Sequence, residues 1–358
     1  MNLEDFGWDD GWAALFAAET VPDAIPGRIL REYRHRYVIQ CAAGVLDGEV
    51  TGTFRHAHPR QEDFPTVGDW VALVPVAGEG KGRIHAVLPR RSAFSRPAPG
   101  KTSDIQVMAA NVDTVFLVSG LDGDFNLRRI ERYLTMAYDS GANPVILLNK
   151  CDLEPALEAR IGEVEGVAYG VPIHGVSSLS GAGLDSLRSY AKPGKTLVCL
   201  GSSGAGKSSL VNALLGNTVM ETGDVREDDS RGRHTTTHRE LFPLPDGGLI
   251  IDTPGIRELQ VSGSGENLEA AFGDVEAWLD GCQFRDCTHS GERGCAVEGA
   301  IERGELDPKR FEAYQRLQRE MAYTERRHSE SYHYEERKRG KELGKMIRRT
   351  LNEKQNRR

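Results

Sequence analysis

A short glycine- and serine-rich segment limits the fold of this chain more than any other feature. Residues 201–208 read GSSGAGKS and match the pattern GxxxxGK[ST], in which backbone N–H groups wrap a phosphate. In that pattern Lys207 reaches the outer phosphates and the Ser208 hydroxyl binds Mg²⁺. The apolar run 196–200 predicts a strand before the loop, and residues 209–215 predict a helix after it, whereas a flexible linker would need neither. We therefore expect a phosphate site whose candidate residues are Gly201, Ser202, Ser203, Gly204, Ala205, Gly206, Lys207, Ser208 and Ser209.

A second motif selects the base. NKCD, residues 149–152, follows the apolar run 144–148, so it lies at the end of another predicted strand. The carboxylate of Asp152 can accept hydrogen bonds from guanine N1–H and from the exocyclic amine, a donor pair that adenine does not offer. A buried acceptor left unpaired costs about 1–3 kcal/mol, so one aspartate can reject adenine. We expect Asn149 to tie the loop to its neighbours and Lys150 to cover the base. GTP or GDP is the predicted ligand, with candidate residues Asn149, Lys150, Asp152, Ser177 and Ser178.

Two further segments suit a sensor of the γ-phosphate. DTPG begins at Asp252, which would hold Mg²⁺ through a water, and the N–H of Gly255 would bind the γ-phosphate. The polar segment 231–238, RGRHTTTH, suits a switch in which one threonine closes on Mg²⁺. The sequence does not decide which of the three threonines, 235 to 237, does so, and a solvated loop is the alternative interpretation. The candidate magnesium residues are Ser208, Thr235, Thr236 and Asp252.

These motifs stand in an unusual order. An ordinary GTPase carries the phosphate loop first and NKxD fourth, whereas here NKCD and the segment VSSLSGAG at 176–183 come before the phosphate loop. Strand and helix patterns alternate as far as residue 252, which predicts a parallel, doubly wound sheet. The chain is therefore expected to contain a circularly permuted P-loop GTPase domain of the α/β class.

The catalytic group is less clear than the binding groups. Ras-like enzymes carry a glutamine after the DxxG glycine to orient the attacking water, but this chain has Ile256 there. An isoleucine cannot orient water, so we expect slow intrinsic turnover. His234 is the candidate catalytic residue, with His238 behind it, although a loop histidine is more often simply solvated. A nucleotide-dependent binding module with negligible turnover is a further interpretation.

A cysteine and histidine cluster downstream has the spacing C-x4-C-x-H-x5-C. Three thiolates and one imidazole make a closed tetrahedral zinc site, which is structural rather than catalytic. The alternative is a set of buried cysteines with a histidine nearby. The other three of the six cysteines are scattered, so no disulfide framework is indicated and a reducing cytosol fits. We expect one Zn²⁺ per chain, held by Cys282, Cys287, His289 and Cys295.

Charge is distributed unevenly over the 358 residues, whose net charge is −8. Residues 308–358 hold 16 Lys and Arg against 8 Asp and Glu, so this end is basic. A basic end on an acidic protein favours a polyanion partner, and a solvated helix is the alternative. Residues 1–25 carry no Lys or Arg, which excludes a signal peptide, and their Trp8 and Trp12 suit a short docking helix. No apolar run is long enough to span a bilayer.

The region 26–92 has the pattern of an all-β unit. Its β-forming runs at 28–40, 45–54, 69–75 and 83–89 are separated by Gly, Pro and Asp. This spacing predicts a small barrel of the OB type, a frequent nucleic-acid module. Residues 90–101 are expected to be a connector rich in Pro, Arg and Ser.

Together these features resemble the family of small-ribosomal-subunit-dependent GTPase A, RsgA. The permuted order, RGRHTTTH, DTPG and the CxxxxCxHxxxxxC spacing carry the resemblance, which covers about residues 26–325. It implies that the chain binds the 30S ribosomal subunit and its rRNA late in assembly and hydrolyses GTP with subunit-stimulated turnover. A cytoplasmic monomer with no membrane partner is expected. The acidic N-terminal segment and the basic tail depart from the family pattern, and a permuted GTPase acting on another RNA or protein is the alternative.

The expected fold is multidomain, with an OB-type β-barrel, a permuted α/β GTPase domain and a mostly helical zinc-binding domain. The expected limits are 1–25 for the acidic segment, 26–92 for the barrel, 105–262 for the GTPase domain, 266–325 for the zinc-binding domain and 326–358 for the basic helical tail.

Overall fold

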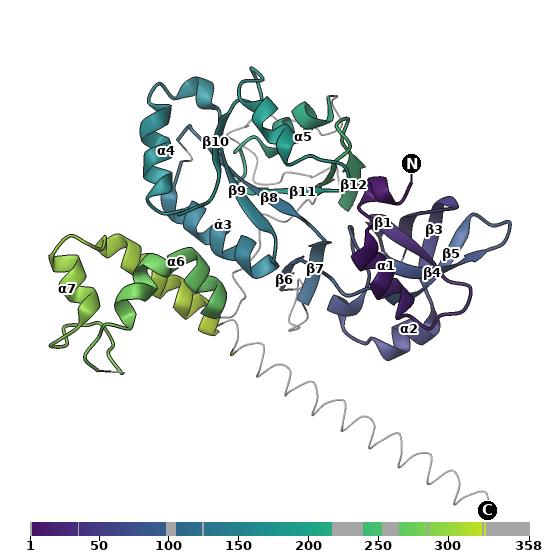
Figure 1. Cartoon of the computed structure of the whole chain (residues 1–358), viewed down its shortest axis with the longest axis horizontal. Coiled ribbons are helices and arrows are strands. Elements are labelled where there is room, and N and C mark those ends of the chain that lie inside the picture. The colour runs from purple at the N-terminus through teal and green to yellow at the C-terminus, as the bar shows by residue number, and fades with distance from the viewer. Residues whose placement is uncertain are drawn as a thin grey trace, which may run out of the picture.

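The computed structural model is drawn in Figure 1 and describes residues 2–34, 36–97, 105–123, 125–216, 239–252, 265–284, 286–323 and 326. A small β-barrel stands at the N-terminal end, an α/β sheet in the middle and a group of helices at the C-terminal end. This arrangement confirms the three-part fold class expected from the sequence. The basic tail lies outside the described residues, apart from Arg326.

The N-terminal unit is a closed barrel of five strands. Its strand order is β1-β2-β3-β5-β4, and β4 pairs back onto β1, as in the OB type. Side chains that alternate inward along the strands, such as Ile29, Ile39 and Leu73, are fully buried in its core. The strands are β1 (Ile25–Tyr33), β2 (Arg36–Cys41), β3 (Gly44–Val50), β4 (Trp70–Val76) and β5 (Lys81–Val87).

Two runs of the barrel region and the connector after it differ from their sequence-based prediction. The run 28–40 is a hairpin of β1 and β2 instead of one strand. The run 45–54 stops at Val50, because the Thr51 side chain accepts a hydrogen bond from the Phe54 N–H and so caps helix α2 (Gly52–Ala57). The expected connector holds strand β6 (Ala93–Pro97), which pairs with β7 (Ile105–Ala110) in a sheet of its own.

The N-terminal segment forms the expected short helix, α1 (Asp10–Ala17), after the turn η1 (Glu4–Phe6). Its Trp12 is only 3% exposed and packs 6.2 Å from the ring of Trp70, while Trp8 lies 4.8 Å from the same ring. The N-terminal segment therefore packs against Trp70, the first residue of β4.

The central sheet continues in the order β10-β9-β8-β11-β13-β12. All neighbours in it are parallel except β12, which runs antiparallel to β13. Helices α3 and α4 contribute to the core on one face, and α5 with η4 contributes to the core on the other. The elements are β8 (Thr114–Gly120), α3 (Leu127–Ser140), β9 (Asn143–Asn149), η3 (Cys151–Leu153), α4 (Leu157–Glu165), β10 (Ile173–Val176), η4 (Leu184–Ser189), β11 (Thr196–Gly201), α5 (Lys207–Leu215), β12 (Arg239–Pro243) and β13 (Leu249–Asp252).

The barrel and the central sheet are joined by hydrogen bonds. Strand β12 pairs with β13 on one side and with β1 on the other, so the two units form one eleven-stranded sheet. Arg239 pairs with Glu32 at 2.8 Å across this joint. The guanidinium of Arg28, 2% exposed, donates to the carbonyl of Phe6 and to the hydroxyl of Thr196 at 2.8 Å. The domain limits expected from the sequence stay predictions.

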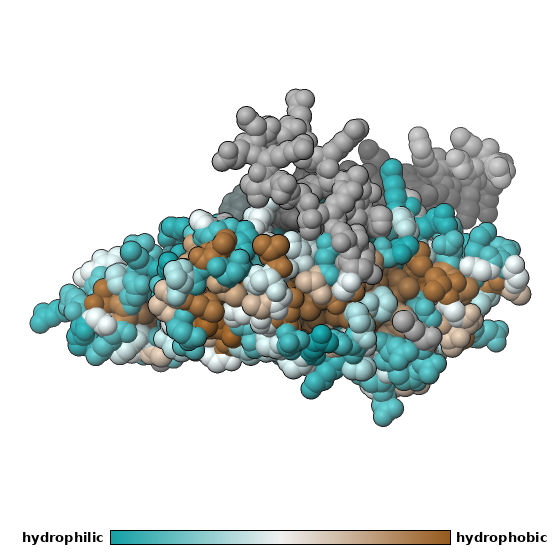
Figure 2. Space-filling model, turned by 90° about the horizontal axis from the view of Figure 1, so that it is seen from above, coloured by the Kyte–Doolittle hydropathy of each residue, from teal (hydrophilic) through white to brown (hydrophobic). Residues whose placement is uncertain are grey.

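The C-terminal helices are α6 (Gly265–Leu279), α7 (Ala296–Glu302) and a helix over residues 308–323. Arg310, 3% exposed, binds Glu131 of α3 at 2.6 Å and Asp274 of α6 at 2.8 Å, which fastens these helices to the central unit. Figure 2 shows one face of the molecule, where apolar patches are broken up by hydrophilic side chains. In the described part of the chain, no helix is both long enough and apolar enough to cross a membrane.

Candidate nucleotide and metal sites

The predicted nucleotide motifs meet at one edge of the central sheet. The last residues of three parallel strands lie in register, since Asn149 pairs with Gly120 on one side and with Val176 on the other. Gly201 at the end of β11 pairs with Val118. Because the carboxyl ends of parallel strands face the same way, the loops after β9, β10 and β11 share this edge, where ligands bind in open α/β sheets.

The phosphate loop links β11 to α5 as its spacing predicts. Gly204 and Gly206 have φ of +82° and +91°, in the left-handed region that favours glycine. Helix α5 begins at Lys207, so its unpaired N–H groups point toward the loop. The ammonium of Lys207 donates to the carbonyl of Gly201 at 2.7 Å and to that of Ser202. The loop therefore has the curvature and the positive groups that a phosphate needs.

Asn149 ties three of the motifs together. Its side chain is fully buried, and its Nδ2 donates to the Ala205 carbonyl in the phosphate loop at 2.8 Å. The same Nδ2 contacts the Ser178 hydroxyl at 3.4 Å, and Oδ1 accepts from the Ser178 N–H at 3.1 Å. One amide thus fixes the phosphate loop, the NKCD loop and the loop after β10 relative to one another.

Lys150 and Asp152, the other two candidate residues of the NKCD loop, are more open. Lys150 adopts a φ of +65°, and its ammonium pairs with Asp122 at the end of the segment after β8. The side chain of Asp152 is exposed and makes no hydrogen bond with the described residues, which leaves both carboxylate oxygens able to accept from a ligand. Asp122 is not among the site residues predicted from the sequence. Its position just after a strand of the same sheet could have indicated that it lies at this edge.

The remaining candidates differ in what the structure shows of them. Ser177 is fully buried, and its hydroxyl accepts from the Ser180 N–H at 3.1 Å, so it supports the turn. Ser208 lies half-buried in the first turn of α5, and Asp252 ends β13. Below the loop, burial raises the pKa of Cys199 to about 12, so this thiol stays protonated. The expected roles of His234, Thr235, Thr236, Thr237, His238, Gly255 and Ile256 lie outside the described residues.

The cysteine and histidine cluster comes together in space. The ligand atoms of Cys282, Cys287, His289 and Cys295 all lie within 4.8 Å of one another. His289 Nδ1 is 3.5 Å from the sulfur of Cys282 and 3.4 Å from that of Cys295. Three sulfurs around one ring nitrogen are compatible with a closed tetrahedral zinc site.

The loop that carries these ligands is held by one carboxylate that the sequence did not single out. Glu292 accepts from the backbone N–H of Thr288 at 2.8 Å and from that of Ser290 at 2.6 Å. The Thr288 hydroxyl also donates to it, and these hydrogen bonds lower the pKa of Glu292 to about 2. The charged Glu292 therefore supports the backbone on both sides of His289, whose φ is +56°.

Comparisons with known proteins agree with this geometry. The family model described as RsgA GTPase matches residues 87–262. The small ribosomal subunit biogenesis GTPase RsgA of Opitutus terrae is 48% identical over 336 residues, which cover 91% of this chain and 92% of the relative. The RsgA 1 protein of Oceanobacillus iheyensis is 42% identical, over 96% and 98%. The chain belongs to the RsgA GTPase family.

Solved structures show the same architecture for this RsgA-family member. YjeQ from Thermotoga maritima is 29% identical with a TM-score of 0.63, covering 84% of this chain and 99% of YjeQ. YloQ, described as a circularly permuted GTPase, has a TM-score of 0.60 at 24% identity and shows the fold, covering 85% and 98%. The protein is a GTP-hydrolysing enzyme with the permuted fold predicted from its motif order.

Proposed function

We propose that this GTPase binds the small ribosomal subunit, acts in its late maturation and hydrolyses GTP with turnover that the subunit stimulates. The observation that carries the nucleotide part is Asn149, which joins the phosphate loop to the NKCD and Ser178 loops. The names of relatives that match over nine-tenths of the chain support the ribosomal part. The expected division into domains, a monomeric state and a cytoplasmic location belong to the same proposal.

The described residues suit the roles that we assign to them. The exposed carboxylate of Asp152 accepts from the guanine edge, and the stem of Lys150 covers the base. Lys207 would turn from the carbonyls of its own loop to the outer phosphates. Ser208 and Asp252 would hold Mg²⁺, which neutralises charge on the phosphates during transfer. Ser177 supports this site through its turn and not through a direct contact.

His234 is the catalytic residue in this proposal. The sequence predicts a loop around His234, and catalysis needs the imidazole held in attacking geometry, so we expect slow turnover until the subunit places it there. His234→Ala should lower 30S-stimulated turnover about 100-fold, the size of a general-base contribution, and leave GTP and 30S binding near normal. Phosphate release measured with and without 30S subunits, at fixed ionic strength, tests this.

His238→Ala is the matched control because it removes the neighbouring histidine. Stimulation that survives in His234→Ala but disappears in His238→Ala would assign the water to His238. Turnover stimulated by another RNA and not by 30S subunits would support the alternative, a permuted GTPase with a different partner. No turnover under any condition would leave a binding module.

The four-ligand cluster holds one structural Zn²⁺ in our proposal. Structural zinc contributes on the order of 10 kcal/mol to a small unit, so Cys287→Ser should unfold the C-terminal helices and spare nucleotide binding. Cys41→Ser, in the barrel and outside both the cluster and the nucleotide motifs, is the control. Metal analysis should find about one zinc per chain in the parent and in Cys41→Ser, and its absence from carefully purified parent protein would count against the site.

A further inference from the structure

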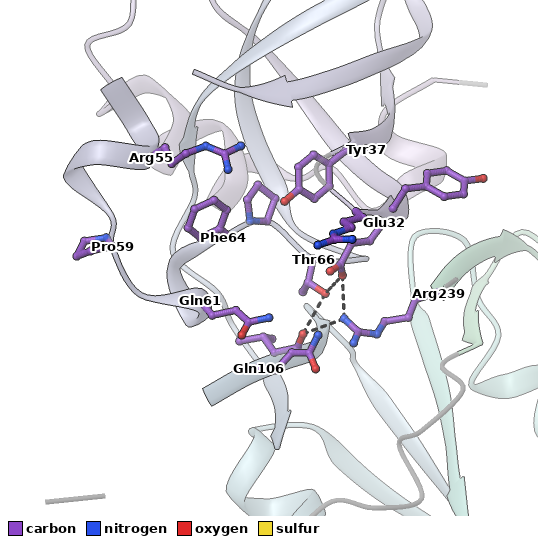
Figure 3. A pocket seen from close by; sticks show the side chains of 13 residues that line it. Glu32, Tyr37, Arg55, Pro59, Gln61, Phe64, Thr66, Gln106 and Arg239 are labelled. Carbon is purple, nitrogen blue, oxygen red and sulfur yellow. Dashed lines mark hydrogen bonds and ion pairs between the residues drawn. The ribbon is translucent and has the colours of Figure 1, made fainter. Parts of the chain in front are cut away.

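A cavity of about 740 Å³ lies where the barrel meets β7 and β12 (Figure 3). We call it the junction pocket, and its lining includes Tyr37, Arg55, Phe64, Gln106 and Arg239. Ligand pockets usually measure about 300–1,000 Å³, so the space suits a nucleotide-sized ligand. None of the lining residues belongs to the phosphate loop, NKCD or the zinc cluster, so this pocket is separate from the GTP site.

One wall of the junction pocket is aromatic. Phe64 packs edge-on against Phe54, with ring centroids 5.8 Å apart and planes at 88°, which fixes the ring. The guanidinium carbon of Arg55 lies 5.7 Å from the centroid of Phe64. Tyr33, 42% exposed, also lines the pocket. Flat rings next to arginine form the kind of surface on which unpaired bases stack.

A tyrosine hydroxyl points into this space without a partner among the described residues. Tyr37 is 5% exposed, and its hydroxyl is directed into the pocket in Figure 3. It makes no hydrogen bond with the residues that the structure describes. Burial raises the pKa of Tyr37, so the group is a donor at neutral pH. The ring is held by burial while the hydroxyl faces the pocket, so it is placed to donate to a ligand there.

The pocket also carries unbalanced positive charge. The single carboxylate among its described lining residues, Glu32, is already bound by Arg239 at 2.8 Å and by the Thr66 hydroxyl at 2.8 Å. Arg34 and Arg55 are exposed at the pocket and form no ion pair within the described part of the chain. Two unpaired guanidinium groups on a chain of net charge −8 favour an anion, and a phosphate fits the guanidinium fork.

Side-chain amides complete the set of groups. Gln61 and Gln106 both line the pocket in Figure 3. The Oε1 of Gln106 accepts from Arg96 at 3.5 Å, which leaves its Nε2 able to donate. Amides both donate and accept, as the edges of bases require. A simple anion would not use the aromatic wall, and an acidic peptide would not use the ring faces, so a nucleotide uses more of these groups than either.

We propose that the junction pocket binds one unpaired nucleotide, with its base against Phe64 and its phosphate between Arg34 and Arg55. The nucleotide is either part of a single-stranded RNA or free, since both offer the same base and phosphate. The proposal does not rest on the ribosomal function, because it concerns a pocket with its own chemistry.

The test uses the full-length protein saturated with GDP and Mg²⁺, so that the GTP site is filled. Anisotropy of fluorescein-labelled hexanucleotides of uridine and of adenosine gives the RNA affinity, and unlabelled AMP and UMP serve as competitors. Phe64→Leu removes the ring but keeps an apolar side chain, and should weaken RNA binding about tenfold. Arg55→Gln should weaken it about threefold to tenfold. Arg83→Gln on β5 removes the same charge outside the pocket and should change it less than twofold.

Displacement by millimolar AMP or UMP would identify free nucleotides as ligands, and displacement by RNA alone would identify a strand; both support the pocket. A cross-link from 5-iodouridine RNA to the peptide that holds Phe64, found by mass spectrometry, supports it directly and does not depend on a variant. Unchanged RNA affinity in both Phe64→Leu and Arg55→Gln, with unfolding temperatures equal to the parent, would overturn the proposal. So would stronger displacement by polyglutamate than by RNA.

Discussion

At the scale of single residues, the two glycines of the phosphate loop with positive φ differ in how much space a side chain would have. A Cβ at Gly206 would lie 2.2 Å from Asn149 Nδ2, the amide that joins the motifs. A Cβ at Gly204 would meet nothing within 4 Å. Both glycines have positive φ, so alanine at either position would strain the backbone. Only at Gly206 would its Cβ also clash with a neighbour.

Gly206→Ala should therefore lower GDP affinity at least about tenfold and lower the unfolding temperature, because Asn149 must move away from the Ala205 carbonyl. Gly204→Ala should cost only about 1–2 kcal/mol of stability, from its left-handed backbone. Titration calorimetry with GDP and thermal unfolding of both variants measure this. Equal effects of the two substitutions would show that the Asn149 contact does not organise the loop.

At the scale of elements, helix α1 is held by one aspartate. Asp9 accepts from the Trp12 N–H at 2.9 Å as the helix cap and binds both terminal nitrogens of Arg91 at 2.7 Å. The guanidinium of Arg91 lies 4.1 Å from the Trp12 ring centroid. The hydrogen bond from Arg91 is the main reason that the pKa of Asp9 falls from 3.8 to about 2.

Because the pKa of Asp9 is lower in the folded state, the charged carboxylate stabilises the fold at pH values above 3.8, the pKa in the unfolded chain. This contribution is lost as the pH falls toward 2. Asp9→Asn keeps the cap but loses the charge. Because the pair is half exposed, we expect a loss of about 0.5–1 kcal/mol near pH 7 that fades between about pH 4 and pH 2. Urea unfolding followed by tryptophan fluorescence reads this out, since three of the four tryptophans lie in this cluster.

Asp10→Asn is the control, because Asp10 forms no ion pair within the described residues. A pH-independent difference between Asp9→Asn and the parent would show that the Arg91 pair does not hold the helix.

At the scale of the whole molecule, Arg310 joins units far apart in the sequence. It contacts Glu131 in α3 and both carboxylate oxygens of Asp274 in α6, from the helix over residues 308–323. Its guanidinium also lies 4.2 Å from the ring centroid of Phe272. This buried cluster links the C-terminal helices to α3, beside the more exposed pair of Arg132 and Glu320.

Arg310→Met should destabilise the C-terminal helices by about 3 kcal/mol, because it takes the guanidinium away from half-buried Asp274 and leaves buried Glu131 with Arg128 alone. Hydrogen exchange should rise in α6 and in the helix over residues 308–323, while GDP affinity stays unchanged. Arg319→Met, an exposed change on the same helix, should have no such effect. Adding Glu131→Leu to Arg310→Met should recover part of the loss, and no recovery would argue against the ion pair as the link.

The sequence by itself determined the features that are written in short contiguous segments. The phosphate loop, NKCD, the metal spacing of residues 282–295 and the alternation of strands and helices follow from local chemistry, so the nucleotide, the fold class and the permutation could be predicted. The permutation does not disturb the site, because parallel strands bring their carboxyl ends to one edge whatever their order in the chain. The strand predicted over residues 45–54 was wrong from Thr51 onward, because the hydrogen bond to the Thr51 side chain begins a helix there.

Tertiary structure alone decided which distant residues meet. The bond from Asn149 to Ala205 spans 56 positions, and the one from Arg28 to Thr196 spans 168. No periodicity marks Arg28 as buried, because its burial depends on acceptors from four other segments, at Phe6, Gly68, Asn111 and Thr196. The same burial lowers its pKa to about 10. The junction pocket likewise exists only because β1 pairs with β12. Such contacts depend on long-range packing, which the pattern of neighbouring residues does not encode.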